Sequence, residues 1–323
     1  MRRASLFIVL LLAGALAVAA FVFFNGWVGD GPLTGDKRVA IPQGATLTSA
    51  ARLLEKEGVV GSSSIFLSRA KLLGGSAPIK AGEYIFPRRA SNSQVLNILQ
   101  SGKAVTYLVT IAEGLPSILV HEKLMAEKEL TGTVPVPVEG SIMPDSYAFE
   151  RGESRAVVVA RMQKAMRDYL AKAWANRLPT TPVKSPQEAV TLAAIVEKET
   201  GVAAERPIVA GVYSNRLRIG MRLQADPTII YPITKGKPLG RRIRRSEILA
   251  VNGYNTYSME GLPKGPIANP GRAAIDAVLR PAQTKALYFV ADGRGGHVFA
   301  DTLEQQNANV RKWFEIRRQR GEL

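Results

Sequence analysis

Two glutamates at the end of one apolar helix are the residues of this chain best suited to acid–base chemistry. Between Ala189 and Val196 all side chains are small or aliphatic apart from one threonine, and Glu197 and Glu199 follow directly. A carboxyl group held against apolar side chains prefers its neutral form. A neutral acid at working pH can donate a proton to the oxygen of a leaving group. The simpler alternative is that both glutamates lie on an exposed last turn and are solvated.

The helix that carries these acids has clear start and stop signals. Ser185 is an N-cap, Pro186 suits the first helical position, and Glu188 is expected to complete a capping box. Gly201 is expected to end the helix in the left-handed conformation. On a helical wheel Glu199 falls among aliphatic side chains. The helix is therefore expected to pack on several sides and to hold this acid in an apolar setting.

The polar and aromatic residues in the same half of the chain suit a sugar polymer. Aromatic rings can cover the apolar faces of pyranoses, and amides can bond hydroxyl and acetamido groups. Each such residue alone is more often structural than functional. The candidate substrate-binding residues are Asn215, Arg216, Gln224, Asp226, Tyr254, Asn255, Thr256, Tyr257 and Asn269.

Two kinds of glycosidic cleavage fit these residues. Hydrolysis usually needs a second carboxylate as base or nucleophile, and Glu197 and Asp226 are the candidates. Transfer of the sugar to one of its own hydroxyls can run on one carboxyl, which acts as acid and then as base. Glu199 is the candidate for that role.

Composition excludes several other chemistries. The chain has no cysteine, which rules out thiol catalysis, and only two histidines, His121 and His297, so no metal site or cofactor is expected. We find no phosphate-binding loop and no GxSxG nucleophile elbow. The net charge of +16 suits an anionic partner. The expected membrane anchor favours lipid head groups or a wall polymer as this partner and disfavours nucleic acid. The densest basic patch is Arg241–Arg245. The alternative for this patch is a solvated surface without a partner.

The N-terminal sequence predicts a membrane anchor. After residues 1–5, which include two arginines and are expected to be cytoplasmic, residues 6–24 carry no charge over 19 positions. About 20 apolar residues span a bilayer. A cleaved signal peptide is the alternative, because Ala17–Ala19 resembles a cleavage site. The apolar run continues to Phe24, which favours an uncleaved anchor with the rest of the chain outside the cytoplasm and Trp27 at the membrane interface.

The remaining chain predicts an α+β protein of two modules. Residues 25–37 are expected to be a linker. Residues 38–105 show a strand–helix–helix–strand order. This order, with the strand "KAGEYIFP", resembles a LysM-like module, a fold used on N-acetylglucosamine polymers. The alternative is a spacer without affinity for sugar. Residues 106–323 are expected to form a larger α+β catalytic domain. Its predicted elements are helices at 117–128, 154–177, 204–217, 272–279 and 302–320 and a hairpin of 286–291 with 297–300.

Four long motifs of this chain resemble those of one known family. The stretches 193–231, 254–271 and 287–307, and "EGSIMPDSYAF" with Ser146 in place of a usual threonine, are similar to the signatures of the endolytic murein transglycosylase (YceG-like) family. They occur in the family's order and cover most of 139–310. The anchor and the LysM-like module also match the family's layout.

This resemblance implies an inner-membrane protein with its catalytic domain in the periplasm. It implies cleavage of nascent peptidoglycan strands between N-acetylmuramic acid and N-acetylglucosamine, which leaves 1,6-anhydromuramyl ends and limits strand elongation. The family's catalytic glutamate maps onto Glu199, with Glu197 in support. Peptidoglycan strands and the membrane are the implied partners, with peptidoglycan synthases as further candidates. The basic stretch 236–248 departs from the family pattern, so the partner of its arginines stays open.

Two competing hypotheses remain at this point. A hydrolase of the same bond would use Asp226 or Glu197 as its second carboxylate and would produce reducing ends. A non-catalytic scaffold, anchored in the membrane and bound to the wall, would rest on the LysM-like module and the positive charge.

Overall fold

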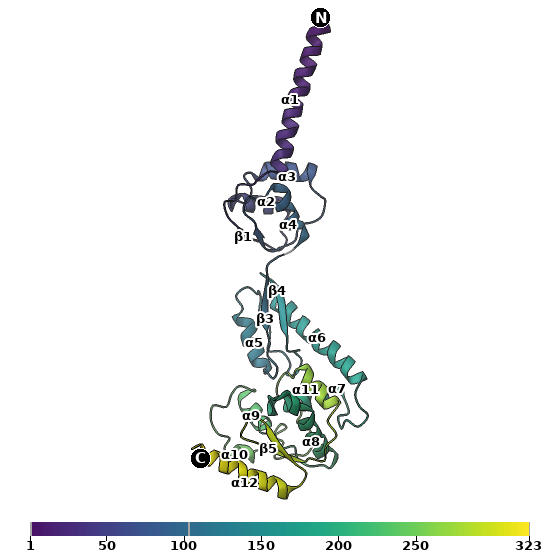
Figure 1. Cartoon of the computed structure of the whole chain (residues 1–323), viewed down its shortest axis with the longest axis vertical. Coiled ribbons are helices and arrows are strands. Elements are labelled where there is room, and N and C mark those ends of the chain that lie inside the picture. The colour runs from purple at the N-terminus through teal and green to yellow at the C-terminus, as the bar shows by residue number, and fades with distance from the viewer. Residues whose placement is uncertain (1, 103, 323) are drawn as a thin grey trace. The chain divides into compact units, whose positions relative to one another are not determined.

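The computed structural model describes residues 2–102 and 104–322, and the chain forms two compact units (Figure 1). The smaller unit comprises Met1–Tyr107 and Ala148–Glu153, and the larger comprises Leu108–Tyr147 and Ser154–Leu323. The chain leaves the smaller unit along β3 (Thr106–Thr110) and returns along β4 (Ser146–Glu150), and these two strands pair with each other. Each unit has its own hydrophobic core.

The smaller unit follows the predicted strand–helix–helix–strand order. Its elements are α1 (Arg2–Val28), β1 (Lys37–Ile41), α2 (Leu47–Lys56), α3 (Ser63–Leu73), β2 (Gly82–Phe86) and α4 (Asn92–Ser101). The strands β1 and β2 are antiparallel, with Val39 opposite Tyr84. Alternate strand residues turn inward, so Tyr84 and Phe86 are buried against the three short helices. The likeness to a LysM module stays a prediction.

The helix α1 is long and apolar enough to cross a membrane between Phe7 and Val28. The helix continues to Val28, and the Trp27 side chain is 6% exposed, with its ring 6.4 Å from that of Phe66 in α3. Leu33, within the predicted linker, is also buried in this core. The placement of Trp27 at the membrane interface stays a prediction.

The larger unit is mainly helical. Its elements are α5 (Ser117–Ala126), α6 (Arg155–Ala175), α7 (Pro186–Glu199), the 3-10 turn η1 (Ala203–Glu205), α8 (Arg206–Arg218), α9 (Pro227–Thr234), α10 (Arg245–Ile248), α11 (Arg272–Leu279), β5 (Tyr288–Ala291), β6 (His297–Ala300) and α12 (Leu303–Gln319). The predicted hairpin is present as antiparallel β5 and β6. The elements β4, α9 and α10 were not predicted from the sequence. The helix α7 packs against α6, α8, α9 and α11, which explains its apolar circumference.

The two ends of α7 differ in detail from the prediction. The Ser185 hydroxyl caps the helix by accepting the Glu188 N–H at 3.1 Å. The Glu188 carboxylate does not complete a capping box, because it accepts the N–H of Lys184 at 2.6 Å instead. Gly201 does not adopt the left-handed conformation. The chain leaves the helix one residue earlier, at Thr200, whose backbone is extended with φ −138°.

Candidate active site

The carboxyl group of Glu199, at the last position of α7, is enclosed by the larger unit. Its Oε1 atom is buried and has no hydrogen-bond partner among the residues that the structure describes. Burial raises the pKa of Glu199 to about 7, and the negative charge of Asp226 raises it as well. The Tyr213 hydroxyl, which donates a hydrogen bond to this carboxyl, and the charge of Arg216 lower it. The solvated alternative therefore does not hold for Glu199, which can carry a proton near neutral pH.

The neighbouring helix α8 supplies Tyr213 and Arg216. Both side chains are buried on the side of α8 that faces α7. The Arg216 guanidinium donates from Nε to the Leu287 carbonyl at 2.7 Å and from Nη1 to the Leu223 carbonyl at 2.6 Å. Two carbonyls thus hold a fixed positive charge near Glu199.

Asp226 and Tyr257 complete the cluster from the exposed side. Asp226 lies immediately before α9, and its Oδ1 accepts a hydrogen bond from the Tyr257 hydroxyl at 2.6 Å. The charges of Asp226 and Glu199 both raise the pKa of Tyr257, after burial as the main cause. The structure therefore brings four predicted residues, Glu199, Arg216, Asp226 and Tyr257, into one electrostatic cluster.

The predicted amides Asn215 and Asn255 use their side chains to hold the backbone. Asn215 donates to the carbonyls of Thr284 and Ala286 at 2.9 and 3.0 Å. Asn255 is fully buried and donates to three carbonyls of the 247–250 turn. Such residues shape the site without facing it.

Asn269 and Thr256 are equally buried. Asn269 accepts the N–H of Ile142 at 3.0 Å and donates to the Leu115 carbonyl at 2.9 Å, so it joins the loop before α11 to the "EGSIMPDSYAF" motif. The Thr256 hydroxyl accepts the N–H of Ala225 at 3.0 Å. Both side chains fix the loops around the cluster.

Gln224 and Tyr254, like Asp226, have accessible side chains beside these loops. Gln224 is exposed and has a left-handed backbone with φ 51°. Tyr254 is half-buried, with its ring 4.8 Å from that of Tyr231 and 5.0 Å from the Lys264 Nζ.

Glu197 has different surroundings from Glu199. Its side chain is 5% exposed, its Oε2 accepts the N–H of Gly271 at 2.8 Å, and Arg206 lies 3.6 Å from its Oε1. Burial raises its pKa, and the Gly271 hydrogen bond opposes that rise. A Cβ atom at Gly271 would collide with the Glu113 carboxyl, so glycine allows the backbone at position 271 to lie close to Glu113. Glu197 ties the end of α7 to the start of α11.

Comparison with known proteins decides the family. The model of the YceG-like family matches residues 39–312. This chain belongs to the YceG-like family. It is 26% identical over 315 residues to an endolytic murein transglycosylase of Bacillus subtilis, with 87% of this chain and 86% of that protein covered. It is 28% identical to an endolytic murein transglycosylase of Streptococcus pneumoniae, with 84% of this chain and 57% of that protein covered.

A solved relative supports the same family fold. The crystal structure of a YceG-like protein from Listeria monocytogenes matches this chain with a TM-score of 0.53 and 27% identity, over 85% of this chain and 99% of that one.

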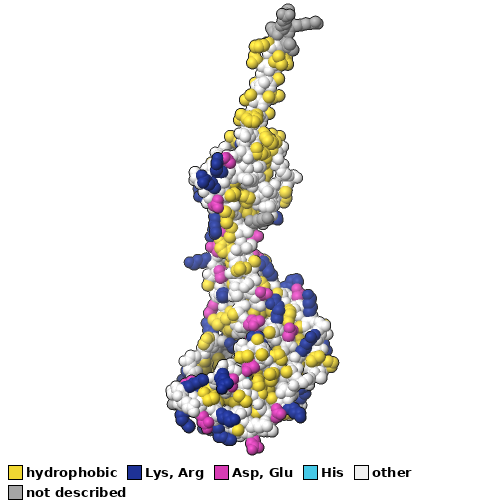
Figure 2. All heavy atoms as spheres, viewed as in Figure 1, with side chains coloured by type: hydrophobic (Ala, Val, Ile, Leu, Met, Phe, Trp, Pro, Cys, Tyr) yellow, Lys and Arg dark blue, Asp and Glu magenta, His cyan; other side chains and the backbone are white. Residues whose placement is uncertain are grey.

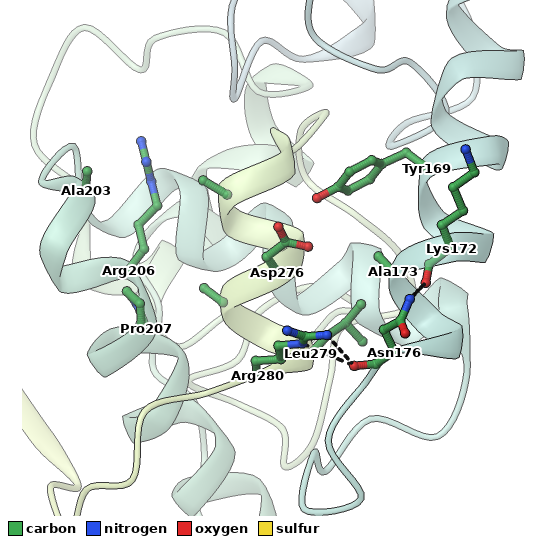
Figure 3. Close-up of a pocket in the computed structure, with 12 residues that line it drawn as sticks. Tyr169, Lys172, Ala173, Asn176, Ala203, Arg206, Pro207, Asp276, Leu279 and Arg280 are labelled. Carbon is green, nitrogen blue, oxygen red and sulfur yellow. Dashed lines mark hydrogen bonds between the residues drawn. The ribbon is translucent and has the colours of Figure 1, made fainter.

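Two pockets of this YceG-like chain lie near the end of α7. One, of about 480 Å³, runs beside Lys198 and Pro227, the neighbours in sequence of Glu199 and Asp226. Its other lining residues are Glu113, Gly114, Leu115, Pro116, Leu119, Ile230, Tyr231, Gly236, Lys237, Pro238, Leu239 and Ile267. The second, of about 610 Å³, lies between α6, α8 and α11, where Tyr169 points toward Asp276 (Figure 3). Glu199 lines neither of these two pockets. The first is the better candidate for substrate because it borders Lys198 and Pro227, the sequence neighbours of Glu199 and Asp226.

Tyr213 is the residue of the cluster that was not predicted from the sequence. It lies in the 193–231 motif, three residues before Arg216. Residues three apart share a face of a helix, so this spacing already placed Tyr213 beside Arg216. The partner of the basic patch stays open: Arg241 pairs with Glu247, whereas Arg242, Arg244 and Arg245 are exposed.

Proposed function

We propose that this chain is a membrane-anchored endolytic lytic transglycosylase. It cleaves the bond between N-acetylmuramic acid and N-acetylglucosamine in nascent peptidoglycan and leaves 1,6-anhydromuramyl ends. The observation that carries the proposal is the buried Glu199 carboxyl, with a pKa raised to about 7 and one oxygen that has no hydrogen-bond partner in residues 2–102 and 104–322. Membership of the YceG-like family supports the same activity, as do the two relatives named endolytic murein transglycosylase.

In the first step, protonated Glu199 donates its proton to the glycosidic oxygen. The bond from this oxygen to C1 of the muramyl residue breaks, and the N-acetylglucosamine hydroxyl leaves. Positive charge develops at C1 and the ring oxygen. The exposed carboxylate of Asp226, oriented by the Tyr257 hydroxyl, can stabilise that charge.

In the second step, the Glu199 carboxylate acts as base. It accepts the proton of the muramyl 6-hydroxyl while that oxygen attacks C1, which closes the anhydro ring and restores the acid. No water molecule is consumed. Tyr213 and Arg216 both favour the ionised form of Glu199, so they stabilise the carboxylate that exists between the two steps. One carboxyl therefore suffices for the whole reaction.

The pocket of about 480 Å³ is the proposed glycan-binding groove. Leu115, Pro116, Leu119 and Ile230 supply apolar surface, and Tyr231 supplies an aromatic ring, for the apolar faces of the sugars. Its neighbours Gly236 and Pro116 approach closely, since a Cβ at Gly236 would lie 2.7 Å from the Pro116 Cβ. Glycine at position 236 therefore lets the backbone pack against Pro116 in the wall of this pocket.

The membrane part of the proposal rests on α1. We infer that α1 is a single-pass anchor in the inner membrane and that the larger unit lies in the periplasm. The apolar length from Phe7 to Val28 supports the span, and the two arginines at positions 2 and 3 favour a cytoplasmic N-terminus.

Mass spectrometry of digested strands tests this function. The full chain in detergent is incubated with uncrosslinked peptidoglycan strands, beside the Glu199→Gln variant. The full chain is used because Trp27, at the end of α1, belongs to the core of the smaller unit. We expect anhydromuramyl ends from the unmodified chain and none from the variant. Reducing ends would instead indicate a hydrolase that uses Asp226 or Glu197. Strand binding without new ends would indicate a scaffold.

A further inference from the structure

The smaller unit has exposed apolar side chains on α3. Ile65 and Leu72 are 51% and 73% exposed and lie seven residues apart, on one face of this helix, and Leu73 is 40% exposed. None of them belongs to the buried core of the unit. Apolar side chains clustered on one helix face usually mark a contact with another apolar surface.

The helix α3 lies alongside the last turns of α1. Its Arg69 donates from Nη1 to the Gly26 carbonyl at 2.7 Å, and the guanidinium carbon lies 5.5 Å from the centre of the Phe23 ring. A cleft of about 600 Å³ separates the two helices. It is lined by Ala19, Val22, Phe23, Ser64, Ile65, Ser68 and Arg69. The face of α3 with Ile65 is therefore level with residues 19–23 of α1.

That level corresponds to the edge of a bilayer. Asn25 is polar and Trp27 is buried in the smaller unit, so the apolar surface that α1 can present to lipid runs from Phe7 to Phe24. At about 1.5 Å per residue this stretch is roughly 26 Å long, against a hydrocarbon core of about 30 Å. Residues 19–23 then lie in the outer part of the hydrocarbon or just beyond it. Arg69 lies at the same end, where a long side chain can place its charge among head groups while its stem stays in apolar surroundings.

We propose that α3 lies in the lipid–water interface of the phospholipid bilayer that α1 crosses. Ile65 and Leu72 enter the acyl-chain region, and Arg69 and Lys71 face the head groups. This inference rests on the proposed membrane span of α1. Phospholipid is favoured over a protein partner because the apolar surface of α1 continues onto the adjoining part of the smaller unit (Figure 2), so the same acyl chains reach both. The smaller unit is thus seated on the membrane surface rather than suspended above it.

Single-cysteine labelling tests the proposal, because the natural chain has no cysteine. The full chain is reconstituted in phospholipid vesicles as four variants, each carrying one nitroxide label. Leu16→Cys reports the middle of the span. Ile65→Cys and Leu72→Cys report α3. Arg38→Cys is the matched exposed control, on β1 at the side of the unit away from α1 (Figure 1). Accessibility to oxygen, which partitions into lipid, is compared with accessibility to a water-soluble nickel complex.

We expect the α3 labels to have an oxygen-to-nickel accessibility ratio several-fold above that of Arg38→Cys and below that of Leu16→Cys. A ratio at Leu72→Cys equal to that of Arg38→Cys, with Leu16→Cys still in lipid, would overturn the α3 proposal alone. Shielding of Leu72→Cys from both reagents would also overturn it, in favour of a protein contact. An aqueous ratio at Leu16→Cys would instead contradict the membrane span, so the two failures are distinguishable.

Discussion

Glu197 and Glu199 stand two residues apart at the end of α7, yet they face two different regions of the larger unit. Glu197 faces the start of α11, where Gly271 donates to one oxygen and Arg206 lies near the other. Glu199 faces α8, where Tyr213 donates to the carboxyl and its Oε1 has no partner in the described chain. Burial raises the pKa of both acids.

The difference between the two regions teaches that a raised pKa does not by itself identify a catalytic acid. Structural carboxylates are also desolvated, but their oxygens are occupied by backbone N–H groups and cations, as those of Glu197 are. A catalytic acid must keep an oxygen available for the substrate. Leaving such an oxygen unpaired in a buried site costs free energy of folding. Unpaired buried polar groups are therefore rare in native proteins, and a catalytic role is one explanation for them.

The largest expected effect separates the two glutamates directly. Glu199→Gln should lower the rate of strand cleavage about 10²–10⁴-fold, the range attributed to general acid–base catalysis. Glu197→Gln is the matched variant, because its amide oxygen can still accept the N–H of Gly271; it should retain activity within about tenfold. Both rates are measured by release of anhydromuramyl ends. An equal loss in both variants would break the distinction between the regions.

The second prediction concerns stability and pH. The pKa of Glu199 rises from 4.5 to about 7 on folding, so ionising this group destabilises the folded state. Its contribution is fully present below pH 4.5 and is lost as the pH rises through about 7. The shift corresponds to about 3 kcal/mol. Glu199→Gln cannot ionise, so its free energy of unfolding should exceed that of the natural chain by about this amount at pH 8 and by little at pH 4.5.

This difference is measured by denaturant unfolding of both proteins in detergent at several pH values, followed by tryptophan fluorescence. Trp174 and Trp313 report on the larger unit. Because both proteins share every other ionisable group, the subtraction isolates Glu199. A difference that does not grow with pH would show that the carboxyl is not desolvated in the folded chain.

The third prediction extends the comparison to the amides. Asn255→Ala leaves three backbone acceptors of the 247–250 turn without their donor, so it should lower the free energy of unfolding by about 1–3 kcal/mol. Asn307→Ala, at an exposed position of α12, is the control and should change it by less than about 0.5 kcal/mol. Cleavage per folded molecule should change little in either variant. A raised KM with unchanged stability in Asn255→Ala would make this amide a sugar ligand.

Local signals made most helices predictable. Ser185 and Thr302 cap α7 and α12 as N-cap residues do, and α11 has the predicted limits. The helix α9 was missed because it is eight residues long and contains Pro232, which a helical pattern seldom includes. The capping role of Glu188 was mispredicted because a flexible carboxylate can reach either of two adjacent N–H groups.

The site was predictable to a different extent. Helical periodicity alone indicated that Glu199 lies among aliphatic side chains, because a wheel needs no tertiary information. It could not indicate what the amides bond to. The side chain of Asn215 suits a backbone carbonyl as well as an acetamido group, and only the fold shows that Thr284 and Ala286 occupy it. Residue type predicts the chemistry of a group, whereas its partners depend on contacts distant in sequence.

Tyr213, which was not predicted from the sequence, gives the prediction with the smallest expected effect and the most specific one. Its hydroxyl lowers the pKa of Glu199, so Tyr213→Phe should raise that pKa further, by up to about one unit for a hydrogen bond of about 1 kcal/mol. Since the proposed reaction needs protonated Glu199, activity should fall as the pH rises through about 7, and this basic limb should move to higher pH in the variant. Tyr257→Phe is the control, because its hydroxyl donates to Asp226 instead. Full pH–rate profiles measure both. A basic limb that stays in place in Tyr213→Phe, or moves to lower pH, would contradict the prediction that the Tyr213 hydroxyl lowers the pKa of Glu199. The pH dependence would then reflect the ionisation of a group outside α7.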